Sequence, residues 1–214
     1  MSILCALLHI GCMVLAPVPV PLQPVKAEPI PLATPADMPT PATKGDRYRA
    51  QITRETHARF GVPGPVPAIA GQIQQESGWN PAAQSRVGAQ GLMQFMPATA
   101  AWAATTAGFG TPDPLNPAWS IRAGVWYDRW LYERIKADSE CDRWMFTFSA
   151  YNGGLGLVYR RQARSHAPGL WDQTGVINPG ISAGNQAENQ GYGPRILHHH
   201  QPDFATWGTV TCPI

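Results

Sequence analysis

Apolar side chains recur every three or four residues in several stretches after Tyr48, which is the spacing of one face of an α-helix. The first stretch holds Ile52, Thr56 and Phe60, and it ends at Gly61 and the proline-rich turn at 62–65. The second stretch has its apolar stripe at Val66, Ile69, Ala70 and Ile73. Glu76 extends that stripe at its carboxyl end, so the pattern predicts a helix that points one acid toward the core side.

Further helices are predicted along the rest of the chain. Pro97 suits the first turn of a helix that continues over 98–106, and Ser120 is the predicted cap of the next helix. The buried stripe of that next helix is Ile121, Val125, Asp128, Leu131 and Ile135. Asp142 opens another helix that Gly153 and Gly154 end, and 155–164 forms one more. Residues 165–190 are rich in glycine, asparagine and proline and are the least predictable part.

No stretch shows a convincing alternation of apolar and polar residues, so any strands should be short. The chain has 214 residues and is 44% hydrophobic, which is enough for one domain with its own core. Only 14% of the residues are charged and the net charge is +2, which argues against a nucleic-acid partner. We expect a mostly α-helical domain over 45–214, and we expect it to be a monomer.

The amino-terminal segment differs from the rest of the chain. Residues 1–27 contain an apolar run that ends in the small residue Ala27, which is typical of an export signal. No lysine or arginine precedes the run and three prolines interrupt it, so an uncleaved membrane anchor stays an alternative. A lipid anchor at Cys12 is disfavoured, because His9 stands where a leucine-like residue is expected. Residues 28–44 are proline-rich and predict an extended linker.

Removal of a signal at residue 27 would leave two cysteines, Cys141 and Cys212. An even pair of cysteines in an exported protein predicts a disulfide. The alternative is two unpaired thiols, one of them buried.

Glu76 is the first candidate for chemistry. A carboxyl among apolar neighbours keeps its proton near neutral pH, and a protonated carboxyl beside a glycosidic oxygen can act as a general acid. Nine residues later comes Ser85, and eighteen residues later comes Gln94. Gln94 offers a donor and an acceptor for sugar groups, and Gly88 and Gly91 allow close approach of the backbone. The alternative for this segment is a turn that joins two helices.

Two segments, from Ile73 to Pro81 and from Gly88 to Pro97, resemble the catalytic core of soluble lytic transglycosylases, glycoside hydrolase family 23. The resemblance implies that Glu76 is the catalytic residue and that Ser85, Met93 and Gln94 bind substrate. The Phe148–Gly154 segment resembles the second signature of the family, and it implies that Tyr151 and Asn152 face the acid and the sugar.

A third segment, Glu188–Tyr192, resembles a Glu-Thr-x-x-Tyr element near the end of the family domain. It adds Glu188 and Tyr192 to the expected substrate-binding residues. Asn189 stands where the family usually has threonine. The three elements keep their order from Ile73 to Tyr192, and the resemblance implies a lysozyme-like helical fold.

The resemblance also implies an activity. A lytic transglycosylase cleaves the bond between N-acetylmuramic acid and N-acetylglucosamine in peptidoglycan glycan strands and forms a 1,6-anhydro product. Glu76 would act as acid and then as base, with no metal and no cofactor. The expected place is the periplasm or cell envelope, in a bacterium that remodels its wall or in a phage that opens one. The alternatives are a goose-type-like muramidase that uses water, and a non-catalytic glycan-binding module of a phage particle or secretion apparatus.

Other groups could carry chemistry instead. His198, His199 and His200 could bind zinc, but three adjacent histidines do not easily converge on one ion. A second carboxylate for a lysozyme could come from Asp113, Asp128 or Asp138, although each also suits a turn or a helix face. The basic residues Arg160, Arg161 and Arg164 are typical of a solvated helix surface that could meet peptide carboxylates.

Overall fold

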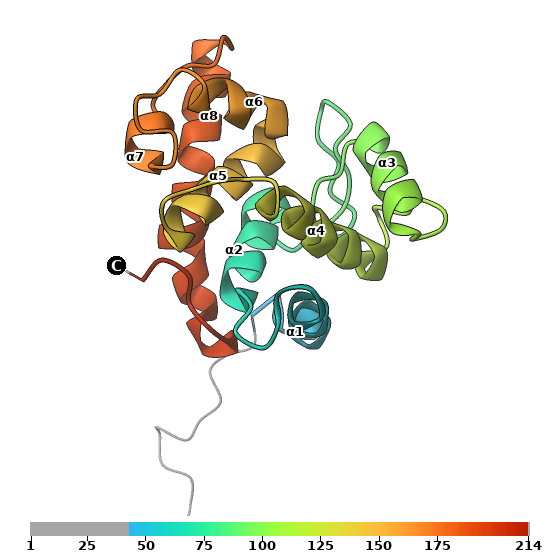
Figure 1. Ribbon diagram of the computed structural model, residues 1–214. Coiled ribbons are helices and arrows are strands. Elements are labelled where there is room, and N and C mark those ends of the chain that lie inside the picture. Colours follow the sequence, from blue (N-terminus) through green and yellow to red (C-terminus); the bar gives the residue numbers. More distant parts are fainter. Residues whose placement is uncertain (1–42, 214) are drawn as a thin grey trace, which may run out of the picture. The chain divides into compact units, whose positions relative to one another are not determined.

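The computed structural model describes residues 43–213, which form a helical domain (Figure 1). The predicted signal or anchor at 1–27 and all but Thr43 and Lys44 of the predicted linker lie outside the described residues. The helices are α1 (Asp46–Phe60), α2 (Val66–Ser77), α3 (Pro97–Ala107), α4 (Pro117–Tyr132), α5 (Glu140–Gly153), α6 (Leu155–Gln162), α7 (Trp171–Thr174) and α8 (Ala183–Pro194). A π-helix, η2 (Arg195–His200), and a 3-10 helix, η3 (Gln201–Trp207), continue from α8.

Extended structure within residues 43–213 is limited to isolated bridges, which pair Gln84 with Gln90 and Gln90 with Phe95. The prediction of a mostly α-helical fold is therefore confirmed. None of the helices in this part of the chain has the length and apolar character needed to cross a membrane.

Helix α2 lies at the centre of the domain, against α1, η2 and η3 (Figure 1). Its first eight residues, Val66 to Ile73, are all buried. A helix that is buried on every side must be apolar or small on every side, and this segment fulfils that requirement except at Gln72. Gly71 allows η3 to pack closely against α2, since a Cβ at Gly71 would lie 3.0 Å from the backbone nitrogen of Gln201. The core is thus built around the helix that carries Glu76.

Two helix starts differ from the prediction. Helix α4 begins at Pro117, and its cap is Asn116, whose side chain accepts a hydrogen bond from the Ala118 N–H. Ser120 lies inside the helix and is buried, and its Oγ accepts a hydrogen bond from the Met93 N–H at 3.2 Å. Ser120 therefore holds the loop that follows α2 and does not cap α4.

Helix α5 begins at Glu140, two residues before the predicted start. Its cap is Ser139, whose side chain accepts from the Asp142 N–H. Asp142 in turn accepts a hydrogen bond from the backbone of Trp171 at 2.8 Å, so it joins α5 to α7. The stretch 165–190 contains α7 and the start of α8, which the composition did not indicate.

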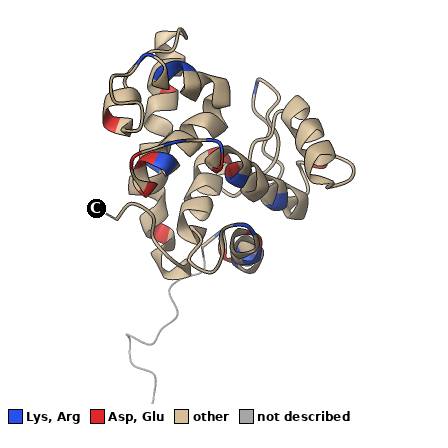
Figure 2. Ribbon diagram, in the orientation of Figure 1, with Lys and Arg blue, Asp and Glu red and all other residues tan. Residues whose placement is uncertain are grey.

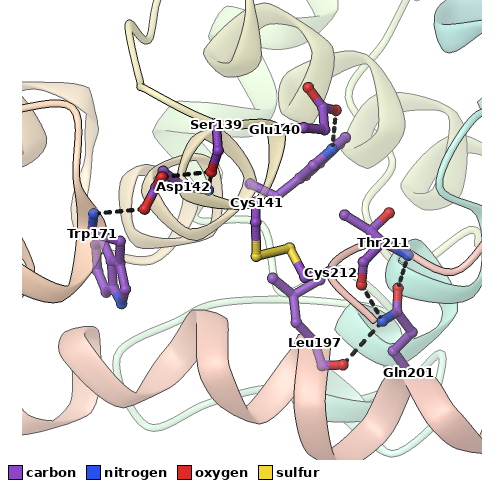
Figure 3. The surroundings of a disulfide bond; sticks show 10 residues. Ser139, Glu140, Cys141, Asp142, Trp171, Leu197, Gln201, Thr211 and Cys212 are labelled. Atoms are coloured by element: carbon purple, nitrogen blue, oxygen red, sulfur yellow. Dashed lines mark hydrogen bonds between the residues drawn. A yellow bond between two sulfur atoms is a disulfide. The ribbon is translucent and has the colours of Figure 1, made fainter. Parts of the chain in front are cut away.

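A disulfide joins Cys141 in the first turn of α5 to Cys212 near the carboxyl end of the chain, with their Cα atoms 5.1 Å apart (Figure 3). Gln201 holds the same terminal segment through its side chain. Its Nε2 donates to the Thr211 carbonyl at 2.7 Å, and its Oε1 accepts from the Thr211 N–H at 2.9 Å. The bridge closes a loop of 71 residues, which contains most of α5, all of α6 to α8, and both η helices.

Loss of this disulfide should destabilise the domain. A loop of this length contributes roughly 4 kcal/mol in the chain-entropy treatment, because the bridge restricts the unfolded chain. We expect the free energy of unfolding of the oxidised protein, measured in urea, to exceed that of the Cys141→Ser/Cys212→Ser variant by about that amount. The urea midpoint of the oxidised protein should be correspondingly higher. Reductant should lower the midpoint of the natural protein and leave that of the variant unchanged. Equal midpoints of the natural protein with and without reductant would show that the bridge does not stabilise the fold.

Candidate active site

A cleft of about 420 Å³ opens beside the carboxyl end of α2. Six of the eight residues expected to act on substrate line it. They come from α2, the loop after it, α5 and α8, and they are Glu76, Ser85, Gln94, Tyr151, Asn152 and Glu188. Segments separated by more than 100 residues in sequence therefore meet at one site.

Glu76 lies in the last turn of α2. The helix ends because Gly78 adopts a left-handed conformation with φ of 55°, which glycine takes without steric cost. Burial raises the pKa of Glu76 to about 7, although a hydrogen bond from Tyr192 acts in the opposite direction, and the negative charge of Glu188 adds a smaller rise. Near neutral pH a large part of the molecules thus carry a proton on Glu76, which a general acid requires.

Tyr192 contacts the acid and does not line the cleft. Its ring is buried in α8, and its hydroxyl donates a hydrogen bond to Glu76 Oε1. No side chain between residues 43 and 213 donates to the other carboxyl oxygen, Oε2. The sequence predicts that Tyr192 binds substrate, but this geometry gives it a different part, which is to hold one oxygen of the acid.

The loop between α2 and α3 forms one wall of the cleft. Gln90 and Phe95 exchange two backbone hydrogen bonds, at 3.0 and 2.9 Å, which fold the loop back on itself. Gly91 has φ of 76°, and a Cβ there would lie 1.7 Å from the Pro114 carbonyl oxygen, so this turn requires glycine. The loop and α3 carry only one charged residue, Arg86 (Figure 2). This wall would therefore contact a ligand mainly through uncharged groups.

Gln94 and Ser85 use part of their hydrogen-bonding capacity inside this loop. The Gln94 side-chain nitrogen donates to the Gly91 carbonyl at 2.9 Å and to the Ala83 carbonyl at 3.3 Å. The Ser85 Oγ accepts from the Ala89 N–H at 2.9 Å. What remains for a ligand is the Gln94 carbonyl oxygen, an acceptor, and the Ser85 hydroxyl proton, a donor.

Tyr151 braces the loop against α5. Its hydroxyl donates to the Met93 carbonyl at 2.8 Å, and its ring lines the cleft. The Met93 side chain is completely buried, and a Cβ on Gly124 of α4 would lie 2.4 Å from its terminal methyl carbon. This placement does not fit the expected contact of the Met93 side chain with substrate, because the side chain fills the space beside Gly124 of α4.

Asn152 and Glu188 are both exposed on the opposite wall. Asn152 lies in the last turn of α5, and its Nδ2 donates to Glu188 Oε1 at 3.3 Å. Glu188 and Glu76 are the two carboxylates among the residues that line the cleft.

Asp128 does not supply a second acid in the cleft. It is completely buried in α4, and it accepts one hydrogen bond, from Gln72 Nε2 to Oδ1 at 3.2 Å. Its Oδ2 and the Gln72 Oε1 both lack partners within the described part of the chain. Burial raises the pKa of Asp128 well above its usual value. Both of these oxygens can only accept hydrogen bonds while Asp128 is ionised, whereas neutral Asp128 also has a hydroxyl that can donate one, so the site suits the neutral acid. The other two candidates, Asp113 and Asp138, do not line the cleft.

Several residues of the cleft had no prediction. Tyr127 of α4 and Thr99 of α3 line it, together with the exposed side chains of Val87 and Met96. Burial raises the pKa of Tyr127 to about 12, so it stays neutral. The one feature of the sequence that could have indicated Tyr127 as a cleft residue is the dense aromatic run from Trp126 to Trp130. Such a run favours core filling when it is taken alone, because half-exposed aromatic residues have the same sequence pattern as buried ones.

The three histidines lie in η2, and the Nε2 of His200 lies 2.9 Å from Gln75 Oε1 of α2, within hydrogen-bond distance. Within residues 43–213 no three histidine, cysteine or acidic side chains converge as metal ligands would.

The Tyr192→Phe substitution should raise the pKa of Glu76. A hydrogen bond to a carboxylate stabilises the charged form, so its removal favours the proton. The check is a carboxyl titration of Glu76 by ¹³C NMR. Tyr159→Phe is a matched control, because the Tyr159 hydroxyl donates to the Arg134 carbonyl at the surface. An unchanged or lower midpoint in Tyr192→Phe would mean that the hydroxyl does not stabilise the carboxylate.

The Asp128→Asn substitution should be tolerated, and increasingly so as the pH rises. The folded protein holds a proton on Asp128 that the unfolded chain loses near pH 4, so the natural protein loses stability as the pH rises above that value. Asn cannot ionise, so the variant lacks this loss. We expect the difference in unfolding free energy to shift toward the variant between pH 4 and pH 8 in urea titrations. A shift in the other direction would indicate a charged, paired Asp128.

Comparison with known proteins supports the resemblance. Residues 54–173 match the family model described as the Transglycosylase SLT domain. The chain is 33% identical over 130 residues to the membrane-bound lytic murein transglycosylase F of Shewanella frigidimarina, an alignment that covers 58% of this chain and 26% of the relative. It is 36% identical over 117 residues to the soluble lytic murein transglycosylase of Salmonella typhimurium, which covers 52% and 17%.

The fold has a counterpart among solved structures. The 70 kDa soluble lytic transglycosylase of Escherichia coli superposes with a TM-score of 0.58 at 25% identity, over 77% of this chain and 26% of that one. The chain therefore spans about a quarter or less of the length of these relatives. Since the family match covers more than half of the chain and includes Glu76, its loop and the Tyr151–Asn152 pair, the protein belongs to the Transglycosylase SLT domain family.

Proposed function

We propose that this protein is a peptidoglycan lytic transglycosylase with Glu76 as its catalytic acid and base. The observation that carries the proposal is that Glu76, one of the two carboxyls that line the cleft, is held through one oxygen by Tyr192, and that burial raises its pKa to about 7. A group that titrates near neutral pH can give up a proton in one step and take one back in the next. The names of the relatives, which are lytic murein transglycosylases, support the same activity.

The first step would be cleavage of the glycosidic bond. Protonated Glu76 donates its proton to the oxygen that bridges C1 of N-acetylmuramic acid and C4 of N-acetylglucosamine. The C1–O bond then breaks, and the N-acetylglucosamine side leaves with a free 4-hydroxyl. The positive charge that develops at C1 is stabilised by the N-acetyl group of the same sugar, so a second carboxylate is not required.

The second step would close the new ring. The Glu76 carboxylate removes the proton from the 6-hydroxyl of the muramic acid sugar as that oxygen attacks C1. The product is a 1,6-anhydro sugar, and Glu76 is protonated again as it was at the start. No water is consumed, so the reaction is an intramolecular transfer and not a hydrolysis.

The polar groups of both walls suit a glycan. Ser85 offers a hydroxyl proton and Gln94 a carbonyl oxygen from the loop, and Asn152 offers an amide from α5. These are the groups that the hydroxyl and N-acetyl substituents of a sugar can bond to. We propose peptidoglycan glycan strands as the partner and a monomer as the working form.

The location follows from the substrate. Peptidoglycan lies in the cell envelope, and the relatives include a membrane-bound lytic murein transglycosylase. We propose that the protein works in the periplasm or cell envelope, and that residues 1–27 direct its export or tether it to the membrane.

A second carboxylate in the cleft favours another candidate function. Glu188 lines the cleft together with Glu76, and most hydrolytic glycosidases use a pair of carboxyl groups for catalysis. A goose-type-like muramidase, in which Glu188 activates water, is therefore the alternative. The two reactions differ in their products, because hydrolysis leaves a reducing end.

The Glu76→Gln variant tests the proposal. Glutamine cannot donate a proton to the leaving oxygen, so release of soluble products from purified sacculi should fall by at least about 10³-fold. Thermal stability should not fall, because burial already disfavours the ionised form of Glu76. The measurement is mass spectrometry of the products, and retained cleavage would exclude Glu76 as the acid.

The Glu188→Gln variant separates the two candidate reactions. A transglycosylase should keep most of its activity and its anhydro products without this carboxylate. If the protein is a muramidase, the variant should lose its activity. The natural protein should then yield products with reducing ends. Binding to sacculi without release of products would instead favour a non-catalytic glycan-binding module.

A further inference from the structure

Arg161 is not part of a solvated basic face. Its side chain is completely buried between α5, α6 and α8, which corrects the interpretation of Arg160, Arg161 and Arg164 as one solvated surface. Arg161 Nη1 donates to Ser149 Oγ at 2.9 Å and to Asn189 Oδ1 at 2.6 Å. Its Nη2 donates to Gln186 Oε1 at 2.7 Å, and its Nε donates to the Ile177 carbonyl at 3.0 Å.

This guanidinium has no carboxylate partner among the described residues, where the ion pairs are Arg54 with Glu55 and Arg129 with Glu133. Burial lowers the pKa of Arg161 to about 10, so it is still charged at neutral pH. An unpaired buried charge is costly unless its hydrogen bonds are satisfied. A neutral side chain of similar size would avoid that cost, so we expect the guanidinium to have a role beyond the packing of the three helices.

An arginine side chain can only donate hydrogen bonds, and this property fixes the orientation of the next side chain. Asn189 must present its oxygen to Arg161, and its amide nitrogen therefore points the other way. That nitrogen donates to the Ser149 carbonyl at 2.9 Å and to Asn152 Oδ1 at 2.8 Å.

The same reasoning then applies to Asn152. Its oxygen accepts the hydrogen bond from Asn189, so its amide nitrogen is left to face the cleft, where it donates to Glu188 Oε1 at 3.3 Å. The orientation of Asn152 thus follows from that of Asn189, which Arg161 fixes at its oxygen and the Ser149 carbonyl fixes at its nitrogen. A reversed Asn152 would instead turn its carbonyl oxygen toward the Glu188 carboxylate, which is a repulsive contact.

We propose that Arg161 and Asn189 are positioning residues that fix the amide of Asn152, so that it presents N–H donors to carbonyl and hydroxyl oxygens of the glycan. The inference rests on the proposed function for the identity of the ligand. It gives a reason for the asparagine at 189, since one side chain both accepts from Arg161 and donates to Asn152.

The alternative is that the network only holds α5, α6 and α8 together. The two ideas differ in what happens when the direction of the bonds is reversed and the packing is kept. Asn189→Asp makes that change, since aspartate has nearly the same shape but only accepts hydrogen bonds when ionised. The introduced carboxylate would form an ion pair with Arg161, which offsets the lost bond to the Ser149 carbonyl and the repulsion between that carbonyl and the new carboxylate oxygen. Asn152 would then have to turn its nitrogen toward that carboxylate and its oxygen toward the cleft.

We expect Asn189→Asp to fold and to raise KM on sacculi, with kcat/KM lowered about tenfold and kcat little changed, because a binding contact is lost. The matched control is Gln186→Glu, which places a carboxylate beside the same guanidinium without a contact to Asn152. The control should keep the activity of the natural protein.

A double-mutant cycle separates positioning from general support of the fold. In an Asn152→Ala background, Asn189→Asp should cause no further loss of kcat/KM, because its effect acts through Asn152. An equal loss in both backgrounds would overturn the inference, and so would full activity of Asn189→Asp. Either result would leave the proposed function intact. An inactive natural protein would instead refute the proposed function.

NMR of the natural protein tests the same idea without any substitution. The Asn189 side-chain amide protons should exchange slowly with solvent, since both are donated inside the protein. Those of Asn152 should exchange quickly and shift when chitotetraose, a chain of four N-acetylglucosamine units, is added. Protected Asn152 protons that do not respond to the sugar would overturn the inference, even if Asn189→Asp fails to fold or the natural protein does not cleave sacculi.

Discussion

The candidate active site depends on one constraint, which is that the Glu76 carboxyl lies partly buried at the end of a buried helix. Helix α2 is enclosed over its first eight residues, and Glu76 follows one turn later, where the helix reaches the cleft. Burial raises the pKa of Glu76 to about 7, and Tyr192 holds one oxygen of the carboxyl. The position of the acid is therefore set by the packing of the domain core, since moving α2 would move Glu76.

The rest of the cleft is arranged so that its polar groups leave selected atoms free. Gln94 and Ser85 each bind part of the loop that carries them, and Tyr151 ties that loop to α5 through the Met93 carbonyl. On the opposite wall, Asn189 holds the oxygen of Asn152. In each case the hydrogen bonds inside the protein decide whether a side chain meets a ligand as a donor or as an acceptor.

Two buried ionisable side chains, Asp128 and Arg161, are accommodated differently. Asp128 accepts one hydrogen bond, from Gln72, and burial raises its pKa strongly, which favours the neutral form. Arg161 stays charged and donates to four oxygen acceptors, none of them a carboxylate. A carboxyl can escape the cost of burial by binding a proton near neutral pH, whereas a guanidinium cannot lose one there, so it needs acceptors around it.

Sequence by itself determined the helical class and a helix that carries Glu76 near its end, because apolar spacing and glycine stops are local properties. The order of the cleft segments followed from the resemblance to the lytic transglycosylase family. Only the tertiary structure decided which side chains reach the cleft. Met93 and Tyr192 lie in matching motifs, yet one is packed against Gly124 and the other against Glu76. Ser120 has the pattern of a cap but binds the loop, and Arg161 has the pattern of a surface residue but is buried. These outcomes depend on partners 27 residues away for Ser120 and up to 28 residues away for Arg161, which no local pattern contains.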